Sequence, residues 1–91
     1  MTEITFDPVK RARTLSERGL DFADAGEIFS GAHFNLADDR KDYGEARILT
    51  FGVLKGRLVA MVWTERDGAR RIISMRHAND REKSRYQTQM G

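Results

Sequence analysis

The hydrophobic pattern of this chain changes its period near residue 31, and this change constrains the possible folds more than any other feature. Before it, apolar residues recur at helical spacing in two segments, 9–15 and 22–29. After it come three segments rich in β-forming residues, 47–54, 58–64 and 70–76. Helices followed by a run of strands are typical of the α+β class.

Capping residues bound the two helical segments. Asp7 is suited to cap a first helix with Pro8 at its first position, and Gly19 is suited to end it. Asp21 is suited to cap a second helix, which ends at Ser30-Gly31. We expect each helix to pack through an apolar stripe: Val9, Ala12 and Leu15 in the first, and Phe22, Ala25, Ile28 and Phe29 in the second.

Turn signals join the later segments into a meander. Lys55-Gly56 and Asp67-Gly68 suit two-residue hairpin loops. Three further elements are a weakly alternating His33–Leu36, a possible edge strand at Ile4–Phe6, and a polar loop over residues 38–45. Asn79 followed by Glu82 is a capping-box pattern that opens a short helix through about Tyr86. The sequence therefore predicts one domain over residues 1–91: a small antiparallel sheet of three to four strands against two N-terminal helices, with a short C-terminal helix.

The composition excludes several kinds of site. The chain has no cysteine, so disulfides and thiolate chemistry are excluded. Its two histidines, His33 and His77, are too few and too far apart in sequence to indicate a metal cluster, and we expect neither a metal nor a cofactor. No segment approaches the ~20 apolar residues of a membrane span, and the N-terminus has no leader pattern. We expect a cytoplasmic protein without a membrane partner.

Charge divides the chain into two unlike halves. Residues 1–45 carry six Lys and Arg against ten Asp and Glu, a net charge of −4, whereas residues 46–91 carry ten against four, a net charge of +6. Twelve of the sixteen basic residues are arginine, whose planar guanidinium binds phosphate bidentately. A basic half of this kind indicates either a nucleic-acid partner or an ordinary solvated surface.

Two-residue loops would fix the register of the meander, placing Leu54 opposite Arg57 and Arg66 opposite Ala69. We predict that one face is the core face and packs against the helices; it carries residues 47, 49, 51, 53, 58, 60, 62, 73 and 75. The opposite face would carry the polar groups, with residues 48, 50, 52, 59, 61, 63, 65, 70, 72, 74 and 76.

The polar face has the groups that cleavage of a phosphodiester needs. Glu65 lies across from Arg70, with Trp63 and Arg76 expected nearby. A carboxylate can take a proton from a ribose 2′-OH, guanidiniums can stabilise charge on phosphorus, and an indole can stack on a base. The other interpretation is an ordinary cross-strand ion pair beside a turn.

Three further residues have both a functional and a structural interpretation. His77 follows the last strand, and histidine is a residue type that exchanges protons at physiological pH, so it is a candidate general acid or base, or a surface histidine. Trp63 is either a stacking platform for RNA or part of the core. Lys10 in the first helix either extends a phosphate path or is solvated.

At this point several motifs resemble the BrnT toxin family. Near the N-terminus these are Phe6-Asp7-Pro8-x-Lys10 and Arg18-Gly19-Leu20-Asp21-Phe22. The acidic stretch 38–47, the central hairpin segments 52–59 and 62–66, and the segment 70–78 followed by Arg81-Glu82 and Tyr86 also resemble that family in order and spacing.

The resemblance implies a ribonuclease toxin of a type II toxin–antitoxin system, with a fold similar to RelE-type ribonucleases. It implies metal-independent RNA cleavage by 2′-OH attack, inhibition of translation, and neutralisation by a BrnA-like ribbon-helix-helix antitoxin. The two proteins would form a heterotetramer that binds operator DNA through the antitoxin. The family's polar and basic positions fall on Arg47, Glu65, Arg70, Arg71 and Arg76.

These roles are expectations for this chain. Glu65 or His77 would accept the proton, Arg70 and Arg76 would stabilise the transition state, and Arg47, Trp63, Arg71 and Lys10 would bind RNA. Many family members have a Lys-His pair where this chain has Glu17-Arg18, so the general acid stays open. Alternative functions are a non-catalytic nucleic-acid-binding module and a structural subunit of a repressor complex.

Overall fold

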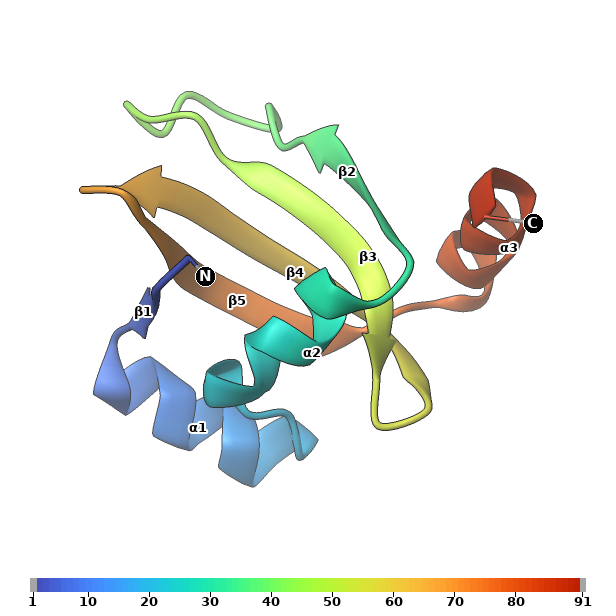
Figure 1. Ribbon diagram of the computed structural model, residues 1–91, viewed down its shortest axis with the longest axis horizontal. Helices are drawn as coiled ribbons and strands as arrows, with labels where there is room; N and C mark the ends of the chain where they lie inside the picture. The colour runs from blue at the N-terminus through green and yellow to red at the C-terminus, as the bar shows by residue number, and fades with distance from the viewer. Residues whose placement is uncertain (1, 91) are drawn as a thin grey trace.

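The computed structural model describes residues 2–90, in which a curved sheet is covered on one face by the N-terminal helices (Figure 1). The elements run in the order β1 (Ile4–Phe6), α1 (Pro8–Arg18), the 3-10 turn η1 (Phe22–Asp24), α2 (Ala25–Ser30), β2 (His33–Ala37), β3 (Ile48–Leu54), β4 (Arg57–Arg66), β5 (Ala69–His77) and α3 (Asp80–Met90). The α+β class and the first helix are as predicted, whereas the second predicted helix is divided into the 3-10 turn η1, which Asp21 caps, and the short helix α2.

The sheet is larger than expected and is mixed. Its five strands lie in the order β1-β5-β4-β3-β2, and β1 pairs with β5 in parallel, with Ile4 opposite Arg70 and Phe6 opposite Ile72. The prediction of three to four antiparallel strands was therefore wrong. The error concerns the two edge strands, β1 with three residues and β2 with five. A hydrophobic pattern over so few residues predicts neither that a strand forms nor in which direction it pairs.

Local capping follows the sequence closely. The Asp7 carboxylate accepts from the Val9 N–H, Gly19 ends α1 with φ of 70°, and the Asp21 carboxylate accepts from the Ala23 N–H. In the predicted capping box, the Asn79 side chain accepts from the Glu82 N–H and the Glu82 carboxylate accepts from the Asn79 N–H, although α3 continues to Met90.

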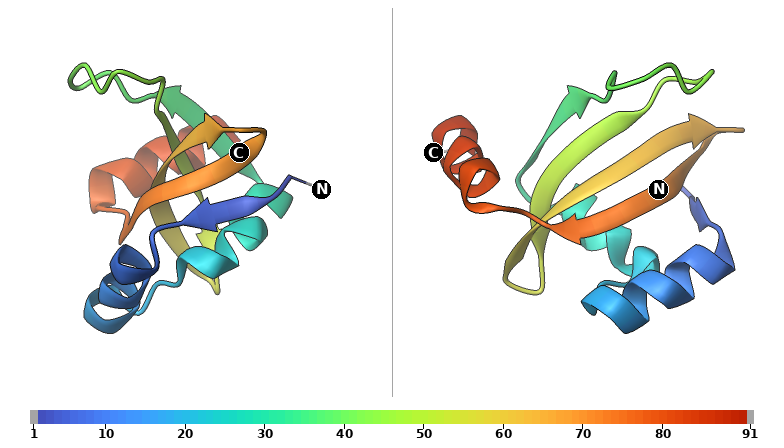
Figure 2. Two further views of the ribbon diagram at one scale, coloured as in Figure 1. Left: turned by 90° about the vertical axis from the view of Figure 1, so that its left-hand side faces the viewer. Right: turned by 180° about the vertical axis from the view of Figure 1, so that it is seen from behind.

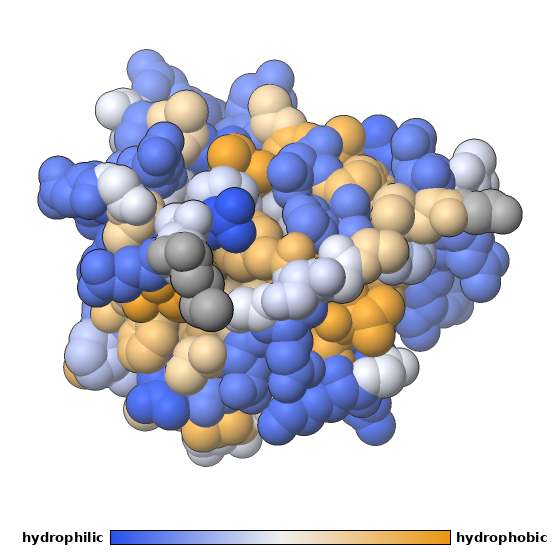
Figure 3. Space-filling model, viewed as in Figure 1, coloured by the Kyte–Doolittle hydropathy of each residue, from blue (hydrophilic) through white to orange (hydrophobic). Residues whose placement is uncertain are grey.

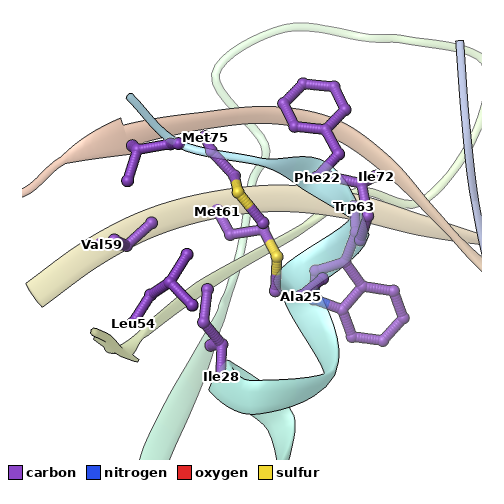
Figure 4. Packing of buried hydrophobic residues seen from close by; sticks show 10 residues of the cluster. Phe22, Ala25, Ile28, Leu54, Val59, Met61, Trp63, Ile72 and Met75 are labelled. Carbon is purple, nitrogen blue, oxygen red and sulfur yellow. The ribbon is translucent and has the colours of Figure 1, made fainter. Parts of the chain in front are cut away.

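The core lies on the face of the sheet that the sequence analysis took for the polar one. Val59, Met61 and Trp63 from β4 and Ile72 from β5 pack against Ile28 and other residues of the helices (Figure 4). The assignment of residues such as Leu49 and Val62 to the helix-covered face was wrong. Alternation sorts residues into two sets, but both sets are apolar in this sheet, so it does not show which one faces the helices.

A glycine marks the helix-covered face. A Cβ added to Gly52 in β3 would lie 2.6 Å from Cγ2 of Ile28 and 3.2 Å from Cβ of His33. The helix α2 therefore contacts the β3 backbone where a side chain is missing. We call this covered side the inner face and the opposite side the outer face.

The apolar stripe predicted for α1 does not enter the core. Val9 is 68% exposed and Leu15 is 43% exposed. The helix is instead held by polar contacts: Arg11 forms an ion pair with Asp21 at 2.7 Å, and a guanidinium N–H of Arg18 donates to the Met75 carbonyl at 2.7 Å. The Arg11 contact and the Ala23 N–H lower the pKa of Asp21 to about 2.

The third helix leaves the sheet at the end of β5 and packs beside β2 (Figures 1 and 2). The Tyr86 ring stacks on Phe34 with centroids 6.1 Å apart, and its hydroxyl donates to the Ala32 carbonyl at 2.9 Å. Phe34 in turn contacts Phe51 at a centroid distance of 5.2 Å. Phe34 and Phe51 are register partners, and both lie on the outer face, where Phe51 is next to Ala60 of β4. The helix α3 therefore covers one end of the outer face.

Replacing Gly52 with alanine tests the packing of α2 on β3. Because the new methyl group would clash with Ile28, we expect Gly52→Ala to lower the free energy of unfolding by about 2 kcal/mol. The matched change Gly26→Ala lies in an open position of α2, with nothing within 4 Å, and should raise that energy by about 0.5–1 kcal/mol. Urea unfolding of both variants measures the difference; equal effects would contradict the contact.

Candidate functional site

The hairpin of β4 and β5 carries most of the predicted site, and its register changes along its length. At the tip, Glu65 is opposite Arg70, as predicted, and Trp63 is opposite Ile72. Beyond a bulge the pairing shifts by one residue, so that Val62 is opposite Ser74 rather than Ile73. A shift of one residue reverses the face of every later side chain in β5.

This bulge divides the predicted site between the two faces of the sheet. Glu65 and Arg70 stay on the inner face with Trp63, whereas Arg76 pairs with Ala60 and turns to the outer face. The prediction that Arg76 lies beside Glu65 and Arg70 was wrong. Arg71, opposite Thr64, is also on the outer face.

Glu65, Arg70 and Trp63 do come together in a shallow cleft at the hairpin tip. Its volume is about 230 Å³, and Thr2, Ile48 and Gly68 complete its lining. Within residues 2–90, no ion pair engages the Glu65 carboxylate or the Arg70 guanidinium. The expected cross-strand ion pair is therefore not formed, although the two residues are direct register partners.

Aromatic rings position the Arg70 guanidinium. Its central carbon lies 4.0 Å from the centroid of the Phe29 ring and 5.3 Å from that of Trp63. The rings of Phe29 and Trp63 meet edge to face with centroids 5.2 Å apart. Sequence analysis missed the role of Phe29, because the periodicity of α2 marks it as apolar without showing which strand residue it meets.

Trp63 supports the cleft from below and does not present its ring to solvent. It is 7% exposed, and its indole N–H donates to the Thr50 hydroxyl at 2.7 Å. That hydroxyl donates to the Asn35 side-chain oxygen at 2.6 Å, which continues the chain of hydrogen bonds to β2. The core interpretation of Trp63 is thus confirmed, and its burial leaves little ring surface for stacking on a base.

The outer face carries a second group of arginines, which are mostly paired. Arg76 makes a bidentate contact with Glu82 in α3, at 2.7 and 2.8 Å, and this contact lowers the pKa of Glu82. It also raises the pKa of Arg76, an effect that burial and, to a smaller extent, repulsion from Arg40 oppose. Asp38 is buried, and its pKa is lowered by a bidentate contact with Arg40.

Arg47 and Arg71 lie at the other end of the outer face, toward the hairpin tip. The Arg47 guanidinium lies 3.9 Å from the Tyr43 ring centroid and contacts Glu45 at 3.3 Å. Glu45 also binds Arg66, at 2.8 Å, and these contacts lower its pKa. Arg71 forms no ion pair with any residue that the structure describes.

His77 and Lys10 lie apart from the cleft. His77 is at the far end of β5 from Arg70, opposite Val59, and its Nε2 is 3.0 Å from the Arg18 carbonyl. Because a carbonyl accepts, Nε2 carries the proton, and the contact joins the end of α1 to the end of β5. Lys10 is an exposed residue of α1. Residues 2–90 also contain no group of three or more potential metal ligands.

Comparison with known proteins assigns the chain to a family. A family model described as the ribonuclease toxin, BrnT, of type II toxin–antitoxin systems matches residues 6–82. This chain belongs to the BrnT family. Among solved structures, the crystal structure of the Brucella abortus ribonuclease toxin BrnT is 28% identical, with a TM-score of 0.66, over 88% of this chain and 100% of that one. No curated protein matches.

Membership in the BrnT family confirms the family resemblance found in the sequence. It identifies the chain as a type II ribonuclease toxin, with RNA as the target and an antitoxin as the partner at the level of the family. Among residues 2–90, no helix is long and apolar enough to cross a membrane.

The contact between Arg76 and Glu82 should anchor α3. In Arg76→Gln the carboxylate loses both guanidinium bonds, and we expect the helix to be destabilised by about 1 kcal/mol. Backbone chemical shifts of residues 80–90 measure its population. An unchanged helix in this variant would contradict an anchoring role.

Low pH should weaken the contact between Arg76 and Glu82, because it protonates the carboxylate. The folded pKa of Glu82 lies below its usual value of 4.5, so the carboxylate stabilises α3 above that pH and the stabilisation is lost as the pH falls further. The helical shifts of residues 80–90 should therefore weaken below pH 4.5 in the wild type and respond less in Arg76→Gln.

Proposed function

We propose that this chain is a metal-independent endoribonuclease that cleaves RNA by attack of a ribose 2′-OH on the adjacent phosphate, at the cleft of Glu65 and Arg70. The observation that carries the proposal is a carboxylate directly opposite a guanidinium, neither of them in an ion pair within residues 2–90, in a chain whose family is described as ribonuclease toxins. Among the described residues that line this cleft, Glu65 and Arg70 are the two charged ones.

Each group has a defined task in this reaction. The Glu65 carboxylate takes the proton from the 2′-oxygen, which bonds to phosphorus as the bond to the 5′-oxygen breaks. The products are a 2′,3′-cyclic phosphate and a 5′-hydroxyl, and the leaving 5′-oxygen takes its proton from solvent. The Arg70 guanidinium binds the phosphate oxygens as negative charge grows on them.

Stacking on Phe29 prepares Arg70 for that task. The contact with the Phe29 ring restricts the motion of the planar guanidinium, so less freedom is lost when phosphate binds. The hydrogen bonds from Trp63 to Thr50 and Asn35 hold the second ring in place. The cleft is thus organised before RNA arrives.

Arg71 and Arg47 extend the proposed RNA path around the hairpin tip. Arg71 is adjacent to Arg70 in the chain but on the outer face, and Arg47 lies on the same face. A strand of RNA passing over the tip would meet guanidiniums on both sides of the sheet. Arg76 and His77 are at the other end of β5 and engaged in structural contacts, so we assign them no step of the cleavage.

We further propose that the antitoxin is a BrnA-like ribbon-helix-helix protein, and that two copies of each form a heterotetramer that binds operator DNA. The support is the type II description of the family, which pairs each toxin with a protein antitoxin. We also propose that the protein acts in the cytoplasm and inhibits translation by cleaving RNA. A non-catalytic role in the same repressor complex is the alternative, and cleavage assays separate the two.

Purified protein should cleave RNA in the presence of EDTA. We expect Glu65→Gln to slow cleavage about 100-fold, because the proton acceptor is lost, and Arg70→Ala to slow it about 100- to 1000-fold. Gel analysis of a labelled RNA, with the 2′,3′-cyclic end identified chemically, measures both effects.

Matched variants control for general loss of charge. Glu17→Gln and Arg13→Ala make similar changes on the exposed surface of α1 and should alter the rate less than about threefold. Full activity of both cleft variants would contradict the assignment of the site. Loss of wild-type cleavage in EDTA would contradict a metal-independent reaction, and RNA that is bound but intact would favour the non-catalytic alternative.

A further inference from the structure

A groove lies between α3 and the turn joining β3 and β4, away from the Glu65 cleft. It has a volume of about 530 Å³. Its apolar lining includes Val53, Leu58 and the Tyr86 ring, and Val53 is 43% exposed. A β-branched side chain left this open on a sheet is typical of an interaction surface rather than a core.

The rim of this groove is basic. Arg57 and Lys83 line it together with His77, and no carboxylate is among the residues that line it. Arg57 has no ion-pair partner within the described chain, and Lys83 has a long contact of 3.9 Å with Asp80. The charge of the rim therefore favours an acidic occupant.

A second groove of about 300 Å³ continues the surface on the other side of Arg57 and His77, which line both. Leu15, from the exposed stripe of α1, contributes apolar surface to it at 43% exposure. Its two carboxylates are already paired, Asp21 with Arg11 and Asp24 with Lys55 at 3.4 Å. Figure 3 shows apolar surface on the viewed side of the molecule broken into patches between hydrophilic residues.

The side chains that line the groove beside α3 favour a peptide over RNA as its occupant. An RNA site at a groove of this kind would need an aromatic face free to stack on a base. Of the two rings that line the groove, Tyr86 already stacks on Phe34 with its hydroxyl bonded to the Ala32 carbonyl, and the His77 imidazole is bonded to the Arg18 carbonyl. Aliphatic groups such as Val53 and Leu58 suit the aliphatic anchors of a peptide instead.

We propose that the two grooves form one docking surface for an acidic segment of the antitoxin, whose aliphatic side chains contact Val53 and Leu15 and whose carboxylates pair with Arg57 and Lys83. The proposal rests on the antitoxin partner of the proposed function and names where that partner binds. It also separates neutralisation from chemistry, since none of these residues lines the cleft of Glu65.

Calorimetric titration of the full chain with its purified antitoxin, the product of the reading frame adjacent to the gene, tests the surface. We expect Val53→Asp and Arg57→Glu each to weaken binding by about 30-fold, because one buries a charge and the other repels the acidic segment. Both side chains are exposed, so folding should be preserved, which thermal melting checks. In the absence of antitoxin, the Val53→Asp variant should cleave RNA at the wild-type rate.

Two matched variants lie outside the grooves. Met90→Asp changes another exposed apolar residue, 37% exposed, and Arg13→Glu reverses another exposed charge; each should alter binding less than about threefold. Wild-type affinity in Val53→Asp and Arg57→Glu would overturn the proposal. If these two variants bound the antitoxin with wild-type affinity but no longer cleaved RNA, the surface would be a binding site for RNA and not for the antitoxin. A wild type that cleaves RNA but does not bind the antitoxin would overturn the docking surface and leave the proposed chemistry intact.

Discussion

A single extra residue in β5, at Ile73, determines on which side of the sheet each charged group of the last strand lies. Before the bulge, Arg70 shares the inner face with Glu65; after it, Met75 turns inward and Arg76 outward. The core supplies the physical reason, since Met75 and Met61 are register partners and both are fully buried. Without the shift, Ser74 would face the core in place of Met75.

The bulge therefore separates two functions that one continuous face would have mixed. At the hairpin tip, Glu65 and Arg70 line an open cleft, and neither forms an ion pair with any residue that the structure describes. At the far end, Arg76 holds α3 through Glu82, and His77 holds the end of α1 through the Arg18 carbonyl. The proposed chemistry and the proposed antitoxin surface thus lie at opposite ends of one hairpin.

Sequence reasoning succeeds here where a signal is local. The caps at Asp7 and Asp21, the capping box at Asn79 and both hairpin turns each depend on residues within four positions of one another, and all form as expected. The pairing of Glu65 with Arg70 was predictable because it lies two pairs from the turn that fixes its register.

What the sequence does not specify is non-local. Nothing in Ile72-Ile73-Ser74 marks a bulge, so the prediction put Arg76 on the same side of the sheet as Glu65 and Arg70, whereas the shift places it on the opposite side. Both faces of the sheet are apolar, and only Gly52, which makes room for Ile28, distinguishes the helix-covered one. The position of Phe29 over Arg70 joins α2 to β5, which no periodicity relates.

The register shift itself is the most direct test of this account. The chain has no cysteine, so paired substitutions report the register without background. Oxidation of Val62→Cys with Ser74→Cys should give a disulfide in most molecules, because these residues are register partners, whereas Val62→Cys with Ile73→Cys should remain reduced. Preferential cross-linking of Val62→Cys with Ile73→Cys would show that the register is not shifted. Arg76 would then lie on the same face as Glu65 and Arg70, which would contradict the separation of the two proposed sites.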